Sequence, residues 1–207
     1  MEDKNTDRRI IRTRQVIRAA LVALIEEKGL DALTVKDITK RANINRGTFY
    51  LHYRDKSDLL EQTVMDIAEE CRNIILKSNE LDLNDYKNSD EPVPIIVTLF
   101  EYFNQNVSLM RALLAIKGDL SFQRQFKKIM WSNAFEKELF IHIKKENILV
   151  PSEYLITYLI SAHLGIIQHW LEKDRRESPQ EMAFILYRLS FYGPFYSAGI
   201  EIGNRIR

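Results

Sequence analysis

Residues 33–60, LTVKDITKRANINRGTFYLHYRDKSDLL, decide the fold of this chain. The stretch predicts two short helices, at about 35–42 and 46–52, and the start of a further helix at Lys56. The residues between the two short helices, Asn-Ile-Asn at 43–45, suit a tight turn, because asparagine tolerates left-handed backbone and bonds its own main chain. Two short helices joined by such a turn are typical of proteins that place one helix in the DNA major groove.

The ends of the expected helices carry residues with capping chemistry. Thr34 is expected to be an N-cap, with Asp37 three residues later as a short form of the capping box. The run Ser-Pro-Gln-Glu at 178–181 is a full capping box with proline at the first helical position. Gly29 suits the left-handed residue that follows a helix end. Further candidate N-caps are Ser121 and Ser152.

The remainder of the chain follows a helical period and shows no sustained alternation of apolar and polar residues. Gly193-Pro194 should kink or break the last helix. The pattern predicts an all-α fold of about nine helices, in which a three-helix DNA-binding domain at 1–56 precedes a larger helical domain at 57–207. The helices outside the opening stretch are expected at about 7–28, 56–78, 93–106, 108–116, 121–146, 152–173 and 178–198.

Composition and charge narrow the class of protein. The net charge is only +1, but residues 1–60 carry 13 Lys/Arg and 9 Asp/Glu, whereas residues 61–207 carry 17 and 20. A basic N-terminal module on a mildly acidic body favours local contact with nucleic acid. Cys71 is the single cysteine, so it can form no disulfide within the chain, and its apolar helical surroundings indicate a core residue. The charged N-terminus and the lack of a membrane-length apolar run predict a cytoplasmic protein without membrane contact.

The opening stretch resembles the DNA-binding module of the TetR family of transcriptional regulators. The resemblance rests on the apolar framework of the stretch, on Gly-Thr-Phe-Tyr at 47–50, on the aromatic cluster that follows, and on Lys56 at the start of the next helix. It covers about the first 60 residues. Beyond them, only the number and order of helices are similar to a TetR-type C-terminal domain, and this similarity implies a regulatory and dimerisation domain at 57–207.

The resemblance and the chemistry of the side chains together imply a set of DNA contacts. Helix N-termini present unpaired backbone N–H groups to phosphate, and polar side chains on the second short helix meet base edges. Phe49 is expected to anchor this helix to the core. The candidate base contacts are Asn45, Arg46, Gly47 and Thr48. The candidate phosphate contacts are Thr34, Tyr50, His52, Tyr53 and Lys56, and Tyr50 can also pack on a thymine methyl group.

Each contact has a plainer alternative that the sequence leaves open. Thr34 can be a helix cap and nothing more, the aromatic residues can be packed in the interior, and Lys56 can be a solvated lysine. The arginines that precede the stretch can enter a minor groove as an extended arm or remain solvated charge. These arginines are Arg8, Arg9, Arg12 and Arg14.

Regulators with one such helix usually act as two-fold dimers on near-palindromic sites. By resemblance, the last two long helices of each subunit would form a four-helix interface between two copies. Small residues there allow close approach of another helix, and large apolar or amphipathic residues suit the interface centre; the alternative is that they fill the subunit's own core. The candidate interface residues are Ser161, Gly165, Ile166, His169, Trp170, Phe184, Tyr187 and Phe191.

The middle helices are rich in methionine and aromatic residues, which line adaptable pockets but also fill ordinary cores. A few polar residues among them are candidates for orienting a small-molecule effector. The candidate pocket residues are Leu99, Phe103, Asn104, Met110, Leu114, Phe126, Met130, Trp131 and His163.

The sequence therefore predicts a ligand-responsive, sequence-specific DNA-binding regulator, a homodimer that a small molecule releases from a palindromic operator. Repression is favoured over activation by the resemblance alone. The alternative is an adaptor of the same fold that acts through protein–protein contacts. The chain contains no phosphate-binding glycine loop, no nucleophile elbow and no zinc-protease motif, so we expect no enzyme activity, no cofactor and no metal site.

Overall fold

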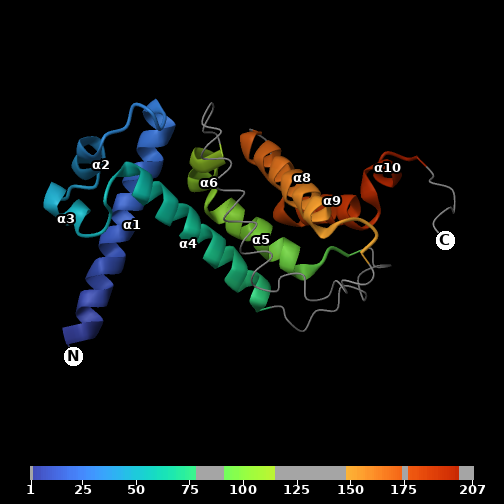
Figure 1. The fold of residues 1–207 in the computed structure, drawn as a ribbon, viewed down its shortest axis with the longest axis horizontal. Helices are drawn as coiled ribbons and strands as arrows, with labels where there is room; N and C mark the ends of the chain where they lie inside the picture. The colour runs from blue at the N-terminus through green and yellow to red at the C-terminus, as the bar shows by residue number, and fades with distance from the viewer. Residues whose placement is uncertain (1, 78–90, 115–147, 174–176, 201–207) are drawn as a thin grey trace. The chain divides into compact units, whose positions relative to one another are not determined.

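The computed structural model describes residues 2–77, 91–114, 148–173 and 177–200, and over these ranges the chain is all-helical (Figure 1). The described residues form nine helices and no strand, which confirms the all-α fold class. None of these helices is both long enough and apolar enough to cross a membrane. With the labels of Figure 1, they are α1 (Glu2–Lys28), α2 (Val35–Arg41), α3 (Arg46–Tyr50), α4 (Lys56–Leu76), α5 (Pro94–Gln105), α6 (Val107–Leu114), α8 (Ser152–Glu172), α9 (Pro179–Phe191) and α10 (Gly193–Ser197).

The described chain divides into two compact units. The first unit contains the residues up to Ile67 and, later in the chain, the described residues from Ser108 onward in α6. The second unit contains the described residues of Ala68–Val107 and those from 148 onward. The boundary that we predicted from sequence lies at the start of α4, whereas this division falls inside α4. The helix therefore contributes residues to both units.

The first unit contains the two short helices in the predicted order. Asn43, in the turn between them, has φ +51°, the left-handed conformation that we expected there. Asn45 is the N-cap of α3, and its side-chain oxygen accepts a hydrogen bond from the N–H of Gly47 at 3.3 Å. Both asparagines thus fix the turn through local geometry, as their sequence position indicates.

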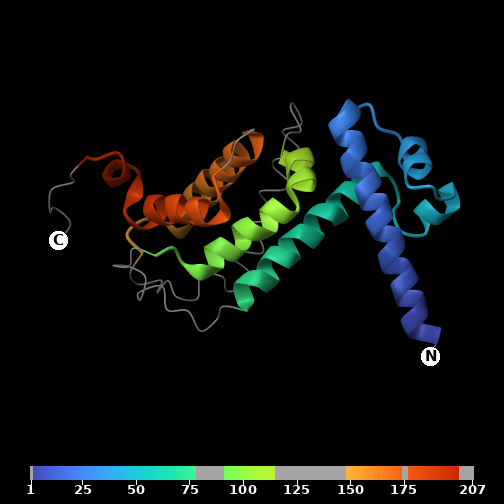
Figure 2. The same ribbon diagram turned by 180° about the vertical axis from the view of Figure 1, so that it is seen from behind.

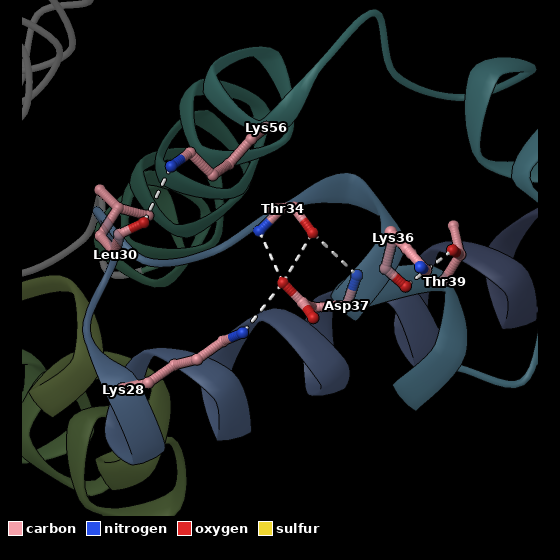
Figure 3. A network of polar contacts seen from close by, with 7 residues as sticks. All are labelled: Lys28, Leu30, Thr34, Lys36, Asp37, Thr39 and Lys56. Carbon is pink, nitrogen blue, oxygen red and sulfur yellow. Dashed lines mark hydrogen bonds and ion pairs between the residues drawn. The ribbon is translucent and has the colours of Figure 1, made fainter.

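A network of polar contacts surrounds the start of α2 (Figure 3). The Oδ2 atom of Asp37 accepts from the backbone N–H of Thr34 at 3.0 Å and from its hydroxyl at 2.6 Å, and the ammonium group of Lys28 lies 2.9 Å from the same oxygen. Thr34 Oγ1 in turn accepts from the N–H of Asp37 at 3.2 Å, which confirms the capping box. The hydrogen bonds from Thr34 and the charge of Lys28 lower the pKa of Asp37 to about 2.

Buried side chains join the first four helices into one core. Ile17 and Leu21 of α1, Ile38 of α2, Phe49 of α3 and Leu59 of α4 are all fully buried. Burying an apolar side chain of this size contributes roughly 1.5–3 kcal/mol. Every one of the four helices therefore has at least one apolar side chain in the same core, including the five-residue α3.

The second unit has an aromatic core of its own. Helices α5 and α9 lie side by side in both views (Figures 1 and 2), and α8 also packs against α9. The ring of Phe100 on α5 meets the buried Trp170 of α8 edge-on, with 5.2 Å between centroids. The indole N–H of Trp170 donates to the carbonyl of Glu177 at 2.8 Å, so this buried polar atom is satisfied.

Cys71 lies in the second unit and is buried, as its apolar surroundings predicted. Burial raises the pKa of the Cys71 thiol to about 12. The thiol therefore stays protonated near neutral pH, and the side chain acts as a small core residue, not as a nucleophile.

The ends of several helices correct or confirm the sequence-based bounds. α1 starts at Glu2, five residues earlier than predicted. The break at Gly193-Pro194 is confirmed, because α9 ends at Phe191 and Gly193 has φ +81°. Ser152 is not an N-cap; it is the first helical residue and follows the extended Pro151. The helix predicted at 121–146 and its cap Ser121 lie outside the described residues.

We expect Phe49→Ala to lower the free energy of unfolding by about 3–5 kcal/mol, because the substitution leaves a cavity in the first unit's core. Urea unfolding of the full chain, followed by circular dichroism, measures this loss. The matched control is Leu51→Ala, two residues away, whose side chain is 82% exposed. We expect it to change stability by less than about 0.5 kcal/mol. Equal effects of the two substitutions would show that Phe49 is not the anchor of α3.

The capping network makes the stability of the fold dependent on pH. The pKa of Asp37 in the folded state, about 2, lies below its ordinary value of 3.8, so the charged carboxylate stabilises the fold above about pH 4. This contribution is lost as the pH falls toward the folded-state pKa. We therefore expect Asp37→Asn to lower the melting temperature most above pH 4 and to approach the wild-type value on acidification. Asp31→Asn, which removes an exposed carboxylate from the same α1–α2 connection, is the control.

Candidate nucleic-acid interface

Helix α3 presents most of its predicted base-reading residues at the surface. Asn45, Arg46 and Gly47 are exposed and Thr48 is half-buried, whereas Phe49 is fully buried. The predicted role of Phe49 as an anchor is confirmed. Because side chains on a helix leave the axis at fixed angles, one buried residue in the middle of this short helix turns the polar residues outward.

Arg46 and Tyr50 form a pair on one side of α3, one helical turn apart. The guanidinium of Arg46 donates to the hydroxyl of Tyr50 at 3.1 Å, and its central carbon lies 5.8 Å from the centre of the Tyr50 ring. Tyr50 is 49% exposed, and its ring also meets Phe49 edge-on at 5.5 Å. The pair thus combines a fixed aromatic ring with a guanidinium that has five N–H donors.

Tyr53 and His52 are placed differently from Tyr50. Tyr53 is 4% exposed and packs against Phe49, with the guanidinium of Arg14 5.9 Å from its ring centre. This burial raises the pKa of Tyr53 and agrees with the alternative that Tyr53 is a packed core aromatic. His52 is half-buried, and its pKa is lowered by desolvation and by Arg14, so the ring is neutral near neutral pH.

The two predicted phosphate contacts at helix starts already have partners within the protein. The hydroxyl of Thr34 donates to Asp37, and the ammonium of Lys56 donates to the carbonyl of Leu30 at 2.8 Å (Figure 3). Lys56 therefore links the start of α4 to the connection between α1 and α2. An ammonium group has three donors, so this bond occupies one of them. Asp37 was expected from the sequence as the capping partner of Thr34, whereas Lys28 and Leu30 were not predicted as partners in this network.

The N-terminal arginines belong to a helix and not to an extended arm. Arg8, Arg9, Arg12 and Arg14 all lie in α1 and are exposed. Figures 1 and 2 both show the N-terminal half of α1 extending past the short helices α2 and α3. These positive charges are therefore carried on a helical surface of the first unit.

Sequence reasoning missed Leu51, which is 82% exposed at the end of α3. The residue follows Tyr50 directly, and its position four residues after Gly47 places it on the same helix face. That spacing was the signal available in the sequence. Leu51 lies on the face of α3 that we expected to contact bases, so we include it in the candidate site.

Helices α8 and α9 border a groove of about 680 Å³ within the second unit. Five of the predicted interface residues line it, namely Ser161, Gly165, Ile166, His169 and Trp170. His163 lines it as well, and its Nε2 lies 3.0 Å from the hydroxyl of Ser190. Burial lowers the pKa of His163, which keeps this ring neutral near neutral pH.

Not all predicted interface residues face outward. Trp170 and Tyr187 are each 1% exposed, so their side chains fill the core of their own unit, as the alternative stated. Phe191 is 37% exposed and lies 4.7 Å from the ring of Tyr187, and the half-buried Phe184 lies beneath the guanidinium of Arg188 at 4.2 Å. The surface part of the predicted interface is therefore the stretch of α8 with small residues together with the end of α9.

Of the predicted pocket residues that the structure describes, only His163 lines this groove. On α5, Leu99 is half-buried and Phe103 is buried, whereas Asn104 is exposed, which argues against its orienting a ligand inside an apolar pocket. Met110 and Leu114 on α6 are buried and belong to the first unit. Three further candidates, Phe126, Met130 and Trp131, lie outside the described residues.

Family profiles match both parts of the chain. A profile of bacterial regulatory proteins of the tetR family matches residues 17–63, which contain most of α1, all of α2 and α3 and the start of α4. A profile of a transcriptional regulator C-terminal region matches residues 90–192. The first match contains the short helices α2 and α3, and the second contains the described helices α5, α6, α8 and α9.

Related sequences are also transcriptional regulators with a helix-turn-helix. The chain is 26% identical over 187 residues to the HTH-type transcriptional regulator YxbF of Bacillus subtilis (strain 168). The alignment covers 88% of this chain and 45% of YxbF. It thus spans less than half the length of this relative. It is 28% identical over 174 residues to the HTH-type transcriptional regulator BetI of Escherichia coli (strain K12), covering 84% of this chain and 73% of BetI.

Solved structures share the fold. A putative TetR-family regulator from Syntrophomonas wolfei matches with a TM-score of 0.69 and 21% identity over 93% of this chain and 98% of its own. A TetR transcriptional regulator from Streptococcus agalactiae matches with a TM-score of 0.60 and 21% identity over 90% and 98%. Because the profiles, the related sequences and the fold all agree with the geometry of α2 and α3, this chain belongs to the TetR family of transcriptional regulators and is not an enzyme.

Proposed function

We propose that this protein is a sequence-specific repressor that binds a palindromic operator as a homodimer and leaves it when a small molecule binds. The single observation that carries the proposal is the outward presentation of α3. Its anchor Phe49 is fully buried, whereas Arg46 and Gly47 are exposed and Tyr50 is 49% exposed. A short helix held in this way can enter the major groove without losing its attachment to the core.

The proposed contacts fall into two groups. Asn45, Arg46, Gly47 and Thr48 would meet base edges, because they start α3 and side chains at the start of a reader helix reach the groove floor. Thr34, Tyr50, His52 and Lys56 would position the protein on phosphates, which carry no sequence information. We leave Tyr53 out of this set, because its side chain is almost fully buried.

Two copies are needed for affinity and for a two-fold operator. We propose that the α8–α9 groove receives the α8 of a second copy, because small residues line it and large apolar side chains lie exposed nearby. Tyr154 is 68% exposed and Tyr158 is 54% exposed on α8. The two reader helices would then address half-sites about 34 Å apart, or a multiple of that distance.

The small-molecule effector would act through α4. This helix contributes residues to both compact units, so a ligand bound to the second unit can bias the helix on which the reader depends. Linkage requires that the ligand lowers operator affinity by the same factor by which operator lowers ligand affinity, typically 5- to 150-fold. Equal ligand affinity for the free and the operator-bound protein would contradict this part of the proposal.

The experiment that tests the function is binding of the full chain to DNA from upstream of its own gene and to sites selected from random DNA. The binding constant is measured across a salt series. A selected palindrome, bound specifically and with a steep dependence on salt, supports a site-specific regulator. Weak binding that non-specific competitor DNA removes, in both arms of the experiment, would favour the adaptor function instead.

Tyr50→Ala should weaken operator binding at least about tenfold, because it removes a proposed phosphate contact and releases Arg46 from its position in each copy. Fluorescence anisotropy with labelled operator measures the loss, and a melting curve shows whether stability is kept. Tyr196→Ala is the matched control, since Tyr196 is 58% exposed on α10 in the second unit. Unchanged operator affinity of Tyr50→Ala would remove Tyr50 from the interface. Lys56→Ala is a poorer test, because it also removes the bond to Leu30.

Gly165→Leu should convert the dimer to a monomer while the monomer stays folded. Gly165 is exposed and a Cβ added there meets nothing within 4 Å, so a side chain can leave the helix at this position without a clash, and leucine favours helix over glycine. At a two-fold interface the extra side chain occurs twice, and overpacking of about 1–3 kcal/mol at each site should weaken dimerisation by tenfold or more. Sedimentation equilibrium measures the change, with Gly165→Ala as the control. A dimer of unchanged affinity would place the interface elsewhere.

A further inference from the structure

Gly47 and Leu51 form the side of α3 that lies opposite its anchor. Each is two residues from Phe49, about 200° around a helix with 3.6 residues per turn. Leu51 keeps helical backbone angles (φ −72°, ψ −20°), and its N–H donates to the carbonyl of Gly47 at 3.2 Å. The two residues therefore lie one turn apart on the outward side of α3, and we call them the Gly47–Leu51 strip.

Among the described residues of the first unit, Leu51 is the most exposed large apolar residue, at 82%, whereas Phe49 is fully buried. A single exposed leucine is common on protein surfaces and indicates nothing by itself. Leu51 is of interest because it lies on the outward side of α3. Helical side chains lean toward the preceding turn, and a Cβ added at Gly47 would meet nothing within 4 Å. The isobutyl group of Leu51 therefore has open space above the backbone of Gly47.

Polar residues flank the strip on both sides. Arg46 and Tyr50, joined by their hydrogen bond, lie on one side, and Thr48 lies on the other. An apolar group between hydrogen-bonding groups needs a partner surface with the same alternation. The floor of the DNA major groove has it, because the C5-methyl of thymine is the apolar feature among the donors and acceptors of the base edges.

We propose that Leu51 contacts the C5-methyl group of a thymine in the major groove and thereby specifies an A·T pair in each half-site. The inference rests on the proposed function, because it requires α3 to enter the groove of an operator. The positive charge of Arg46 beside the strip and the net +4 of residues 1–60 favour DNA over an apolar protein surface as the partner.

The test removes the methyl group from the DNA and the side chain from the protein, separately and together. The full chain first selects its operator from random DNA. Each thymine of the operator is then replaced by deoxyuridine at the symmetric positions of both half-sites, which removes only the C5-methyl and keeps base pairing. Binding constants are measured for wild type and for Leu51→Ala on every operator.

At one thymine position, we expect the replacement to weaken wild-type binding about fourfold for each half-site, which is the loss expected for one buried methyl group. For the two half-sites together, the loss is then roughly 15-fold. Leu51→Ala should bind the thymine operator at least that much more weakly than wild type. It should lose nothing further when thymine is replaced at that position. This loss of sensitivity identifies Leu51 as the partner of the methyl group.

Two variants are controls for the assignment. Met65→Ala removes an apolar side chain that is 46% exposed on α4 of the same unit, and it should keep the full preference for thymine. Thr48→Ser removes the other methyl group near the strip and tests the competing assignment: if this variant loses the preference and Leu51→Ala keeps it, Thr48 is the partner of the methyl group. If Leu51→Ala keeps the preference, or if no thymine of the operator matters, the inference is wrong while the proposed function stands. If wild type selects no sequence at all, both are wrong.

Discussion

Burial of Phe49 is the interaction on which helix α3 depends. A helix of five residues is too short to be stable through its own backbone hydrogen bonds, since nucleation alone fixes about three residues for one bond. The side chain of Phe49 supplies the missing free energy from the core, and Asn45 fixes the first turn. Because every other side chain leaves the axis at a fixed angle from Phe49, this one contact also decides which residues of α3 are exposed. Arg46, Tyr50 and Leu51 owe their exposure to it.

The polar network at the start of α2 also stabilises a short helix, by hydrogen bonds and charge and not by apolar burial. Asp37 completes the capping box of a seven-residue helix, and Lys28 offsets the negative charge that this adds near the expected phosphate path. Lys56 ties α4 to the carbonyl of Leu30. The donors that a phosphate would use are therefore partly occupied within the free protein, so operator binding would exchange internal partners for DNA contacts. That exchange limits the net gain from each contact while it keeps the unbound module in shape.

In the second unit, single helices carry both buried core residues and exposed surface residues. In α8, Trp170 and Leu171 are buried in the unit's own core, whereas Ser161 and Gly165 are exposed on the groove. In α9, Tyr187 is interior and Phe191 is partly exposed. Trp170 and Tyr187 thus lie in the interior, and the surface that we propose for a second copy combines the small residues of the groove with the exposed Tyr154 and Tyr158. Close approach of two helices favours this distribution, because small side chains let the backbones meet.

Features that arise within a few residues of one another could be predicted from the amino-acid order. The left-handed Asn43, the capping boxes at Thr34 and Ser178 and the break at Gly193-Pro194 could all be predicted, because cap and turn geometry is a local property of the backbone. The family resemblance came from the same local stretch. Only the tertiary structure decided that Tyr53 and Trp170 are interior, that Lys56 bonds to Leu30, and that Leu51 is exposed. Burial depends on segments far apart in the sequence, and residue type alone cannot tell which apolar side chain will be covered.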